Sequence, residues 1–423
     1  MEPSFSNLRD LVRAFARSMN LISPELEDHH EKVALLAAAL AEELGLPPAD
    51  QQLCLFGALL HDIGAVTFSR NKDVVLAEVE TNAAFLAKTG AALLRLHPMT
   101  ERFSEIVEAS QSPWELFRGR VLSLGRKALL GQVVHLADII SLLLDGEETA
   151  LNRISVIRDC VLEEGDAEFH PDVLKAFDSL CRRDDVWLTV RYHPECFLRY
   201  LPPDRGISLD ETARLTELMG YIIDFRSPFT AMHSAGVAAS AERLAALSGM
   251  SLRECRMMHV AGSLHDLGKL KISRAILEKP GKLTDEEFNI IKEHAYFTYM
   301  LLKDVRGFEQ IAVWAAYHHE KLNGSGYPFR LGEEALPLGS RIMAVADIFS
   351  AITEERPYRK GMDRERAIRV LRENAASGGT SQQVTELLIA NYDDVNSARE
   401  QASKAAGKRY FASIKDLDVN QKN

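Results

Sequence analysis

The sequence predicts an all-α protein built from two related helical units. Most of its 423 residues fall in segments whose apolar side chains recur every three or four positions, the spacing of one buried helix face. Alternating strand-like runs are few, and the best of them, Val186 to Val190, is short. Short motifs also recur about 200 residues apart, which is typical of a duplicated domain.

The predicted helical segments each show an apolar repeat, and the first also has a stop signal. Residues 31–46 carry apolar side chains at helical spacing, and the following Pro47-Pro48 ends the segment because proline cannot continue a helix. The same period marks residues 287–302, 364–374 and 382–392. After about residue 396, a polar stretch rich in Lys, Ala and Gln predicts a final helix with a frayed end.

The duplication depends on correlated offsets. His29 recurs as His233 and the pair His61-Asp62 as His265-Asp266, both 204 residues later. Residues 137–139 (Ala-Asp-Ile) recur as 346–348, 209 residues later. Chance explains one His-Asp pair but not three matched offsets. With the join near the Pro- and Gly-containing segment 200–206, we predict domains at 1–200 and 201–396, followed by a C-terminal tail at 397–423.

Composition excludes several classes of protein. With 46% hydrophobic and 26% charged residues, the chain is typical of a folded protein. The formal charge of −11 argues against nonspecific binding to DNA. Five scattered cysteines without a CxxC pair indicate reduced thiols. Because we find no run of about 18 apolar residues and no secretory signal, we expect no membrane association and a cytoplasmic location.

Metal-binding side chains cluster in the second half of the chain. They are five imidazoles and two carboxylates: His233, His265, Asp266, His294, His318, His319 and Asp347. Imidazoles suit iron, manganese or zinc, and a carboxylate can bridge two ions. Seven ligands are too many for one four-coordinate ion, but they suit two ions about 3.5–4 Å apart. A lone buried histidine is more often a packed residue, and we interpret His259 in that way.

Residues around this cluster suit an anionic substrate. Lys269 follows the carboxylate of the His-Asp pair by three positions, so on a helix it shares the face of the metal ligands. A Gly-rich turn follows the His-His pair, ends in Gly326-Tyr327-Pro328, and lets backbone approach a ligand closely. Further on, Arg356 and Arg359 could grip a phosphate through two guanidinium groups. Together these features predict phosphoester chemistry.

These motifs resemble the HD-GYP family of bacterial cyclic-dinucleotide phosphodiesterases over about residues 209–394. The resemblance is carried by His-Asp-Leu-Gly-Lys at 265–269, His-His-Glu at 318–320, Gly-Tyr-Pro at 326–328 and Arg-Pro-Tyr-Arg at 356–359. It implies an all-helical HD fold, iron or manganese, and hydrolysis of cyclic di-GMP or 3′3′-cyclic GMP-AMP (3′3′-cGAMP). It makes the seven clustered side chains the metal ligands, with Asp266 and Lys269 as catalytic residues. The implied substrate contacts are Lys269, Gly326, Tyr327, Pro328, Arg356 and Arg359.

Before the first ligand histidine the chain departs from the family pattern. The family usually reads Asp-Pro-Tyr-Thr, whereas this chain has Ser227-Pro228-Phe229-Thr230. Members with three metals place a Glu four residues before that histidine, where Phe229 stands and cannot bind a metal. We therefore predict a binuclear centre and a bias toward the linear dinucleotide as product.

The first half resembles a degenerate HD domain over about residues 28–192. It retains His29, His61, Asp62, His97 and Asp138. Ala65 replaces the lysine, and no histidine pair stands at residues 109–111. The quartet His29, His61, Asp62 and Asp138 could hold a single ion, but we do not expect catalysis there. We predict a regulatory or dimerising role, which leaves a homodimer open.

Two alternative functions stay open on the sequence alone. The chain could be a non-catalytic cyclic-dinucleotide receptor or a protein-interaction module, as the first half already suggests. It could also hydrolyse another nucleotide, as other HD-fold enzymes do, although the Gly-Tyr-Pro loop and the arginine pair disfavour this. The residues decide neither between the two cyclic dinucleotides nor between iron and manganese.

Overall fold

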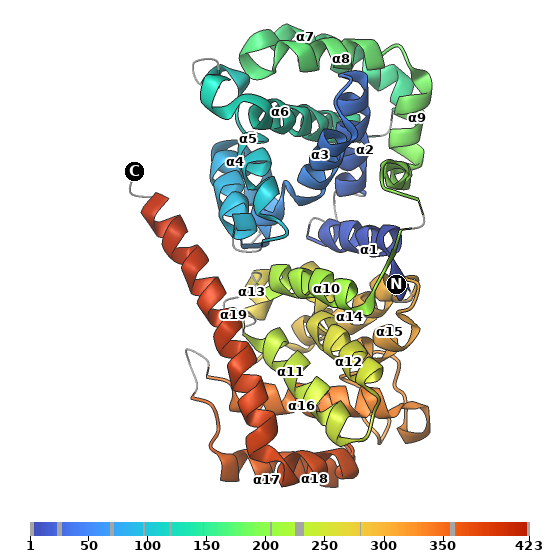
Figure 1. The fold of residues 1–423 in the computed structure, drawn as a ribbon, viewed down its shortest axis with the longest axis vertical. Coiled ribbons are helices and arrows are strands. Elements are labelled where there is room, and N and C mark those ends of the chain that lie inside the picture. The colour runs from blue at the N-terminus through green and yellow to red at the C-terminus, as the bar shows by residue number, and fades with distance from the viewer. Residues whose placement is uncertain are drawn as a thin grey trace. The chain divides into compact units, whose positions relative to one another are not determined.

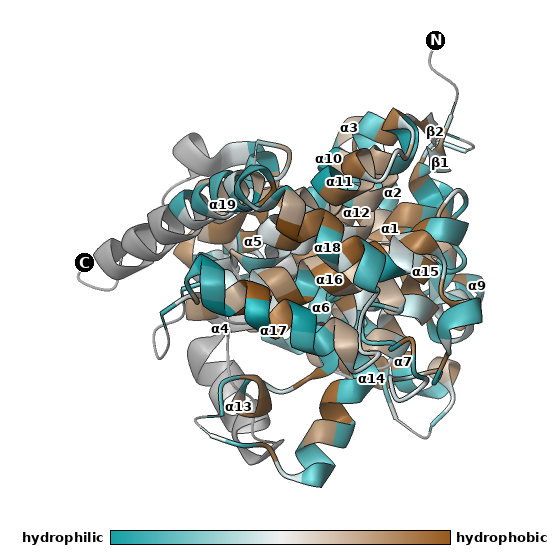
Figure 2. Ribbon diagram, turned by 90° about the horizontal axis from the view of Figure 1, so that it is seen from below, coloured by the Kyte–Doolittle hydropathy of each residue, from teal (hydrophilic) through white to brown (hydrophobic). Residues whose placement is uncertain are grey.

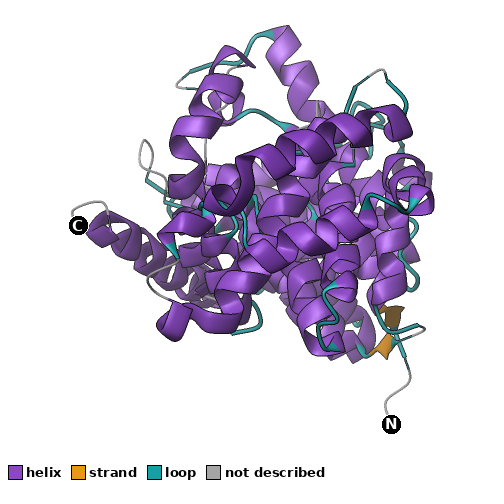
Figure 3. Ribbon diagram, turned by 90° about the horizontal axis from the view of Figure 1, so that it is seen from above, coloured by secondary structure: helices purple, strands orange, loops and turns teal. Residues whose placement is uncertain are grey.

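The computed structural model describes residues 4–22, 28–67, 72–95, 98–117, 121–146, 148–203, 205–224, 232–279, 281–355 and 360–420. Within these ranges almost all regular structure is helical, and the strands β1 (Ser6–Asn7) and β2 (Gly206–Ile207) form one short antiparallel pair (Figure 3). The all-α prediction is confirmed. The chain divides into two compact units. The N-terminal unit comprises Phe15–Pro203 and Ser413–Asn423, and the C-terminal unit comprises Met1–Ala14 and Asp204–Ala412.

Figure 1 labels the helices of both units in chain order. Helix α1 (Leu8–Asn20) runs across the division at Ala14. The N-terminal unit continues with α2 (His29–Glu43), α3 (Pro48–Leu60), the 3₁₀ helix η1 (Ile63–Thr67), α4 (Lys72–Arg95), η2 (Glu101–Phe103), α5 (Ser104–Ala109), η3 (Trp114–Leu116), α6 (Val121–Leu144), α7 (Ala150–Glu168), α8 (Pro171–Leu180), α9 (Asp184–Tyr192) and η4 (Pro194–Tyr200).

The C-terminal unit holds the remaining elements, except that the division at Ala412 assigns the end of α19 to the N-terminal unit. They are α10 (Leu209–Asp224), α11 (His233–Leu247), α12 (Leu252–Leu264), the 3₁₀ helix η5 (Leu267–Lys271), α13 (Arg274–Leu277), α14 (Asp285–Leu302), α15 (Glu309–Ala316), η6 (Glu333–Ala335), α16 (Leu338–Thr353), α17 (Arg364–Ala376), α18 (Gln382–Ala390) and α19 (Tyr392–Asn420). The expected final helix is α19, which begins a few residues earlier than the polar stretch that predicted it.

Both units repeat the same series of elements. Helices α2 and α11 each have 15 residues, α3 and α12 each have 13, and η1 and η5 each have five. In the N-terminal unit α2 packs against α3 and α6, and in the C-terminal unit α11 packs against α12 and α16. The duplication inferred from the sequence is therefore present in the fold.

Local sequence signals explain where the helices begin and end. Helix α2 ends just before Gly45, whose φ of 66° is favourable for glycine, and Pro48 begins α3. Capping boxes begin two helices of the C-terminal unit, Ser251 with Glu254 at α12 and Thr284 with Glu287 at α14. The segments predicted at 287–302, 364–374 and 382–392 coincide with α14, α17 and α18 to within about two residues.

The best of the strand-like runs is not a strand, because Val186 to Val190 lies inside helix α9. Val186, Trp187 and Val190 are buried whereas Leu188 is 40% exposed. The burial therefore follows a helical period and not a period of two. In α17 the buried residues Ala367 and Leu371 are also four positions apart, and most of the other residues of this helix are hydrophilic (Figure 2).

Among the described residues, one helical segment, Gly125–Leu144 in α6, is long and apolar enough to cross a membrane by length and composition. Its most apolar window is 72% buried inside the protein. Helix α6 packs against α2, α3 and α5. The segment therefore has the character of a core helix. All five cysteines are unpaired in the structure.

Candidate metal centre

The His-Asp pair of the second repeat lies at the end of α12. His265 caps this helix and Asp266 begins the turn into η5. The sequence interpretation placed the pair on one helix, which is wrong. Their side chains are only 1% and 3% exposed. Residues three apart eclipse one another in a 3₁₀ helix, and Lys269 Nζ lies 2.6 Å from Asp266 Oδ2. The lysine thus lies on the same face as the pair, as predicted, but through the geometry of a 3₁₀ helix and not of an α-helix.

A glycine brings α14 against this turn. A Cβ on Gly268 would lie 2.1 Å from the carbonyl oxygen of His294, and the Gly268 backbone N–H donates to Thr298 Oγ1 at 3.0 Å. Thr298 Oγ1 donates in turn to the carbonyl of His265 at 3.1 Å. This close approach leaves His294 Nε2 3.5 Å from Asp266 Oδ1. A side chain larger than hydrogen at position 268 would displace His294.

Three histidines are oriented in the same way. Nδ1 of His265, His294 and His318 lies 2.8, 2.6 and 2.6 Å, respectively, from the carbonyl oxygen three residues earlier. A carbonyl only accepts, so each Nδ1 donates a proton and each Nε2 carries a lone pair. The Nε2 atoms of His294 and His318 lie 3.3 Å apart. A cation bound by both nitrogens would relieve the repulsion between these lone pairs.

Burial keeps this part of the site neutral. Desolvation lowers the pKa of His294 to about 3 and that of His319 to about 4, and it also lowers the pKa of His318. The His319 ring centre lies 4.0 Å from that of His318 and 5.1 Å from that of His294. At neutral pH these imidazoles are uncharged, the state in which histidine binds a metal.

His233 and Asp347 reach the same place from α11 and α16. His233 Nε2 lies 3.1 Å from Asp347 Oδ1, and His265 Nε2 lies 4.0 Å from the same oxygen. Burial alone would lower the pKa of His233, but Asp347 and Glu354 raise it to about 10. Burial would likewise raise the pKa of Asp347, but the imidazoles, His233 first, hold it far below its usual range. Asp347 is therefore ionised and available as a ligand.

All seven predicted ligands are brought together. Their donor atoms form three overlapping groups, each within 4.8 Å: His294, His318 and His319; His265, Asp266 and His318; His233, His265 and Asp347. His265 Nε2 and Asp266 Oδ1 are buried without a hydrogen-bond partner among the described residues. Such atoms are costly unless something else binds them. Because the donors are imidazoles and carboxylates, these residues fit a divalent transition metal.

Glu320 holds the Gly-Tyr-Pro loop beside the ligands. Its buried Oε1 accepts from the backbone N–H of Phe329 at 2.6 Å, and Oε2 accepts from that of Leu331 at 2.9 Å. A Cβ on Gly326 would lie 2.5 Å from the Glu320 Cα, so only glycine fits there. The Tyr327 ring centre lies 4.8 Å from that of His319. The carboxylate next to the histidine pair therefore positions the loop.

Several residues singled out in the sequence lie outside the described ones. They are Arg356 and Arg359, expected to hold phosphate, the segment 227–230, on which the binuclear prediction depends, and His97 of the first repeat.

The first repeat forms a smaller cluster. His29 Nε2 lies 3.3 Å from both His61 Nε2 and Asp138 Oδ1. His61 Nε2 lies 3.6 Å from Asp62 Oδ2, and its Nδ1 lies 2.6 Å from the carbonyl of Ala58, the arrangement that His265 also has. The predicted quartet is brought together, and donor atoms of His29, His61 and Asp62 lie within 4.8 Å of one another, close enough to share an ion.

Leu86 stands in the first repeat where His294 stands in the second. A Cβ on Gly64 would lie 2.1 Å from the carbonyl oxygen of Leu86, which matches the approach of Gly268 to His294. The sequence interpretation placed a retained histidine, His97, in this part of the repeat. The geometry gives the position of the third histidine to a leucine, which cannot bind a metal.

Ser110 and Gln111 stand in the place of the histidine pair. Ser110 Oγ donates at 2.9 Å to the carbonyl three residues earlier, the acceptor that His318 uses in its own helix. Gln111 Nε2 then donates to Asp138 Oδ2 at 2.9 Å. With Ala65 in place of the lysine, the described residues of the first repeat show neither the second group of ligands nor the adjacent cation.

Comparison with known proteins identifies both repeats. Residues 26–143 match one family described as an HD domain, and residues 217–379 match another with the same description. The chain contains two HD domains. The C-terminal HD domain carries the seven clustered imidazoles and carboxylates, and the N-terminal HD domain carries the smaller cluster.

Proteins of named activity resemble these HD domains. A 3′3′-cGAMP-specific phosphodiesterase of Vibrio cholerae is 28% identical over 398 residues, which cover 91% of this chain and 92% of that protein. A cyclic di-GMP phosphodiesterase of Pseudomonas aeruginosa is 40% identical over 146 residues, 34% of this chain and 35% of that protein. The chain is thus homologous to HD-GYP phosphodiesterases, as its motifs predicted.

A solved structure shares the fold. A cyclic GMP-AMP-specific phosphodiesterase of V. cholerae superposes with a TM-score of 0.62 at 20% identity, covering 92% of this chain and 98% of that one. The prediction of tandem, all-helical HD domains is therefore confirmed.

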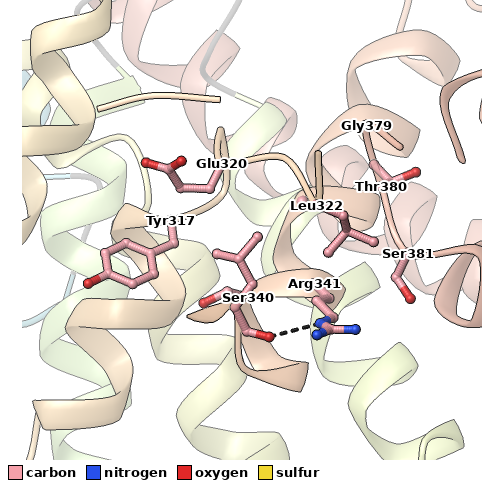
Figure 4. A pocket seen from close by; sticks show the side chains of 10 residues that line it. Tyr317, Glu320, Leu322, Ser340, Arg341, Gly379, Thr380 and Ser381 are labelled. Carbon is pink, nitrogen blue, oxygen red and sulfur yellow. Dashed lines mark hydrogen bonds between the residues drawn. The ribbon is translucent and has the colours of Figure 1, made fainter. Parts of the chain in front are cut away.

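A small pocket of the C-terminal HD domain is not the substrate site. Figure 4 shows it between Tyr317 and Glu320 on one side and Thr380 and Ser381 on the other. Its cavity volume is about 10 Å³, room for a water molecule but not for a nucleotide. None of the seven clustered ligands lines it.

The sequence interpretation was right about His259 and silent about several supporting residues. His259 is hydrogen-bonded between Glu242, at 2.7 Å, and Glu217, at 3.3 Å, and belongs to no ligand group. Glu320 could have been suspected, because it directly follows the histidine pair. The contacts of Gln111 and Thr298 join residues about 30 positions apart, and no local motif marks them.

Proposed function

We propose that this chain is a metal-dependent phosphodiesterase that opens a cyclic dinucleotide to its linear form at the C-terminal HD domain. One observation carries the proposal: seven metal-binding side chains from α11, the end of α12, α14, the end of α15 and α16 converge beside a lysine. The names of the relatives, which act on 3′3′-cGAMP or cyclic di-GMP, support the substrate class.

The position of Asp266 supports a centre of two ions. Asp266 Oδ2 lies 3.2 Å from His265 Nε2, and Asp266 Oδ1 lies 3.5 Å from His294 Nε2. A carboxylate between two groups of imidazoles can bridge two ions, and iron or manganese suits this donor set. When bound, such ions polarise a phosphate oxygen and lower the pKa of water to about 7.

The cationic side chains would act on the substrate phosphate. Lys269 is 20% exposed where its partner Asp266 is 3% exposed, so its ammonium stands at the open edge of the site. A positive charge there would stabilise the charge that develops on the phosphate in the transition state. We assign Arg356 and Arg359 the same task and Gly326-Tyr327-Pro328 the shaping of the pocket, which the contact between Tyr327 and His319 supports.

Of the two substrates, 3′3′-cGAMP is the better supported. The relative that covers 91% of this chain is specific for 3′3′-cGAMP, whereas the cyclic di-GMP phosphodiesterase of P. aeruginosa covers 34%. Incubation of the protein, loaded with Fe²⁺ or Mn²⁺, with each cyclic dinucleotide tests the assignment. We expect the linear dinucleotide as product and none from a His265→Ala variant.

Two results would contradict this function. Recovery of both cyclic dinucleotides intact from fully metal-loaded protein would favour a receptor. Hydrolysis of nucleoside mono- or triphosphates instead would favour a different phosphohydrolase.

For the N-terminal HD domain we propose a single bound ion and a regulatory or dimerising role. The grouping of His29, His61 and Asp62 supports the ion, and Gln111 on Asp138 argues against a second. Deletion of residues 1–200 would also remove β1, which pairs with β2 in the C-terminal unit. A His61→Ala variant, assayed for metal content and for mass by light scattering, is the cleaner test. A cytoplasmic location without a DNA partner is part of the same proposal.

A further inference from the structure

Glu354 gives His233 a partner unlike those of the other ligand histidines. His265, His294 and His318 donate Nδ1 to a carbonyl three residues earlier. His233 is the first residue of α11, so no earlier carbonyl of its own helix is available. Instead, its Nδ1 lies 3.4 Å from Oε2 of Glu354, which caps the end of α16, and both side chains are 5% exposed.

In the N-terminal HD domain the partner of the equivalent Nδ1 is a hydroxyl. His29 is the first residue of α2, and its Nδ1 lies 3.2 Å from Ser141 Oγ. Ser141 follows the carboxylate ligand of its domain by three residues, and Ser350 does so in the C-terminal domain. Ser350 Oγ, however, is buried without a hydrogen-bond partner among the described residues. The carboxylate one turn later contacts the imidazole instead.

The acid that corresponds to Glu354 is engaged elsewhere in the N-terminal domain. Asp145 follows its carboxylate ligand by seven residues, as Glu354 does, but it binds Lys32 at 2.6 Å and Arg191 at 3.1 Å. Gly236 stands 204 residues after Lys32, and it has no charge to offer in the second domain. A cation is nevertheless present there, because the buried Arg399 of α19 packs against Gly236 and interacts electrostatically with Glu354. The two domains therefore differ in which acid lies behind an equivalent histidine.

We infer that Glu354 is a positioning residue for His233. Its carboxylate lies within ion-pair distance of Nδ1 and would take the Nδ1 proton when Nε2, which faces Asp347, binds a metal. This inference rests on the proposed function of the site. A carboxylate behind a ligand histidine fixes its tautomer and ring orientation and raises its basicity, and losing it costs about 10–100-fold in metal affinity. His29, backed by a hydroxyl, is the weaker ligand of the two.

Competition between the full-length protein and a chelator for Mn²⁺ tests this inference. Every variant carries His61→Ala, so that the C-terminal centre alone is measured. Glu354→Gln keeps the size of the side chain and removes its charge, and we expect Mn²⁺ affinity to fall about 10–100-fold. Glu354→Asp should recover part of the loss. The matched control is Glu355→Gln, which removes an exposed neighbouring carboxylate and should leave affinity unchanged.

The reference variant His233→Ala separates two kinds of failure. If it loses Mn²⁺ while Glu354→Gln binds as tightly as the parent, the positioning role is wrong and the metal centre stands. If His233→Ala also binds normally, the proposed centre itself is wrong. Circular dichroism of the metal-free proteins verifies folding. Should Glu354→Gln fail to fold, the comparison of Glu354→Asp with the parent decides, because equal affinity there would overturn the inference.

Discussion

The two HD domains share a frame of helices and differ in the side chains that it carries. Both begin a helix with a histidine, end the next helix with a His-Asp pair, and use a glycine to bring a long helix close. The C-terminal domain then adds His294, His318 and His319, where the N-terminal domain has Leu86, Ser110 and Gln111. The fold therefore needs the glycine and tolerates loss of the second ligand group.

The largest expected effect separates the two His-Asp pairs. His265→Ala removes a ligand shared by two of the metal groups, so turnover should fall by at least about 10³-fold and metal content should drop. His61→Ala alters the N-terminal cluster only and should leave turnover within a few-fold of the parent. Product analysis with metal measurement checks both. Equal losses in the two variants would show that both domains take part in hydrolysis.

Lys269 and Ala65 give the next test. Lys269→Ala should retain its metal and lose about 10²–10³-fold in rate, because it removes a stabilising charge and no ligand. The reverse change, Ala65→Lys, should create no activity in a His265→Ala background, since the second ligand group is still missing. If Lys269→Ala lost its metal instead, the main task of this lysine would be to hold Asp266, which it contacts at 2.6 Å.

Acid should destabilise the C-terminal domain more than the N-terminal one. The folded-state pKa of His294 is about 3 and that of His319 about 4, below the usual 6.5. Between about pH 4 and 6.5 the unfolded chain therefore binds more protons, and stability falls as pH falls. The pKa values of His61 and His233 are raised to about 10, so the stability that these histidines contribute is lost only as pH rises above 6.5. Because one lies in each domain, they do not change the comparison.

Tryptophan fluorescence can report each domain of the metal-free protein separately. Trp314 lies in the C-terminal unit, whereas Trp114 and Trp187 lie in the N-terminal unit. Urea unfolding followed by Trp314 alone should show a loss on the order of 2 kcal/mol for each of the two histidines from pH 6.5 to 4.5. A Trp314→Phe variant, which reports the other domain, should show less. Equal shifts would mean that these histidines are not neutral in the folded protein.

The smallest expected difference concerns the shared glycines. Gly268→Ala and Gly64→Ala each place a Cβ about 2.1 Å from a backbone carbonyl, so each should destabilise its own domain by about 1–3 kcal/mol. Thermal or urea unfolding measures both. Only Gly268→Ala should also reduce turnover, because the carbonyl that it displaces belongs to His294. A loss of stability in only one of the two variants would mean that the two turns are not equivalent.

The N-terminal equivalent of His294, Leu86, could not be found by counting residues along the sequence. The His-Asp pairs recur at an offset of 204 because the helices before them have equal lengths. The connections after them do not: Leu86 follows His61 by 25 positions, whereas His294 follows His265 by 29. A count of 29 positions from His61 therefore reaches residue 90 and misses Leu86, and the retained His97 follows His61 by 36 positions. The contact between a glycine and a carbonyl across two elements identified the equivalent residue.

The sequence by itself determined the helical class, the duplication and the seven side chains of the candidate centre. These follow from local periodicity and from motifs whose members are adjacent or repeated. Only the tertiary structure decided what supports them: Thr298 on the His-Asp turn, Glu320 on the loop, Glu354 behind His233 and Gln111 on Asp138. Such contacts join elements whose order along the chain does not specify which of their polar side chains meet.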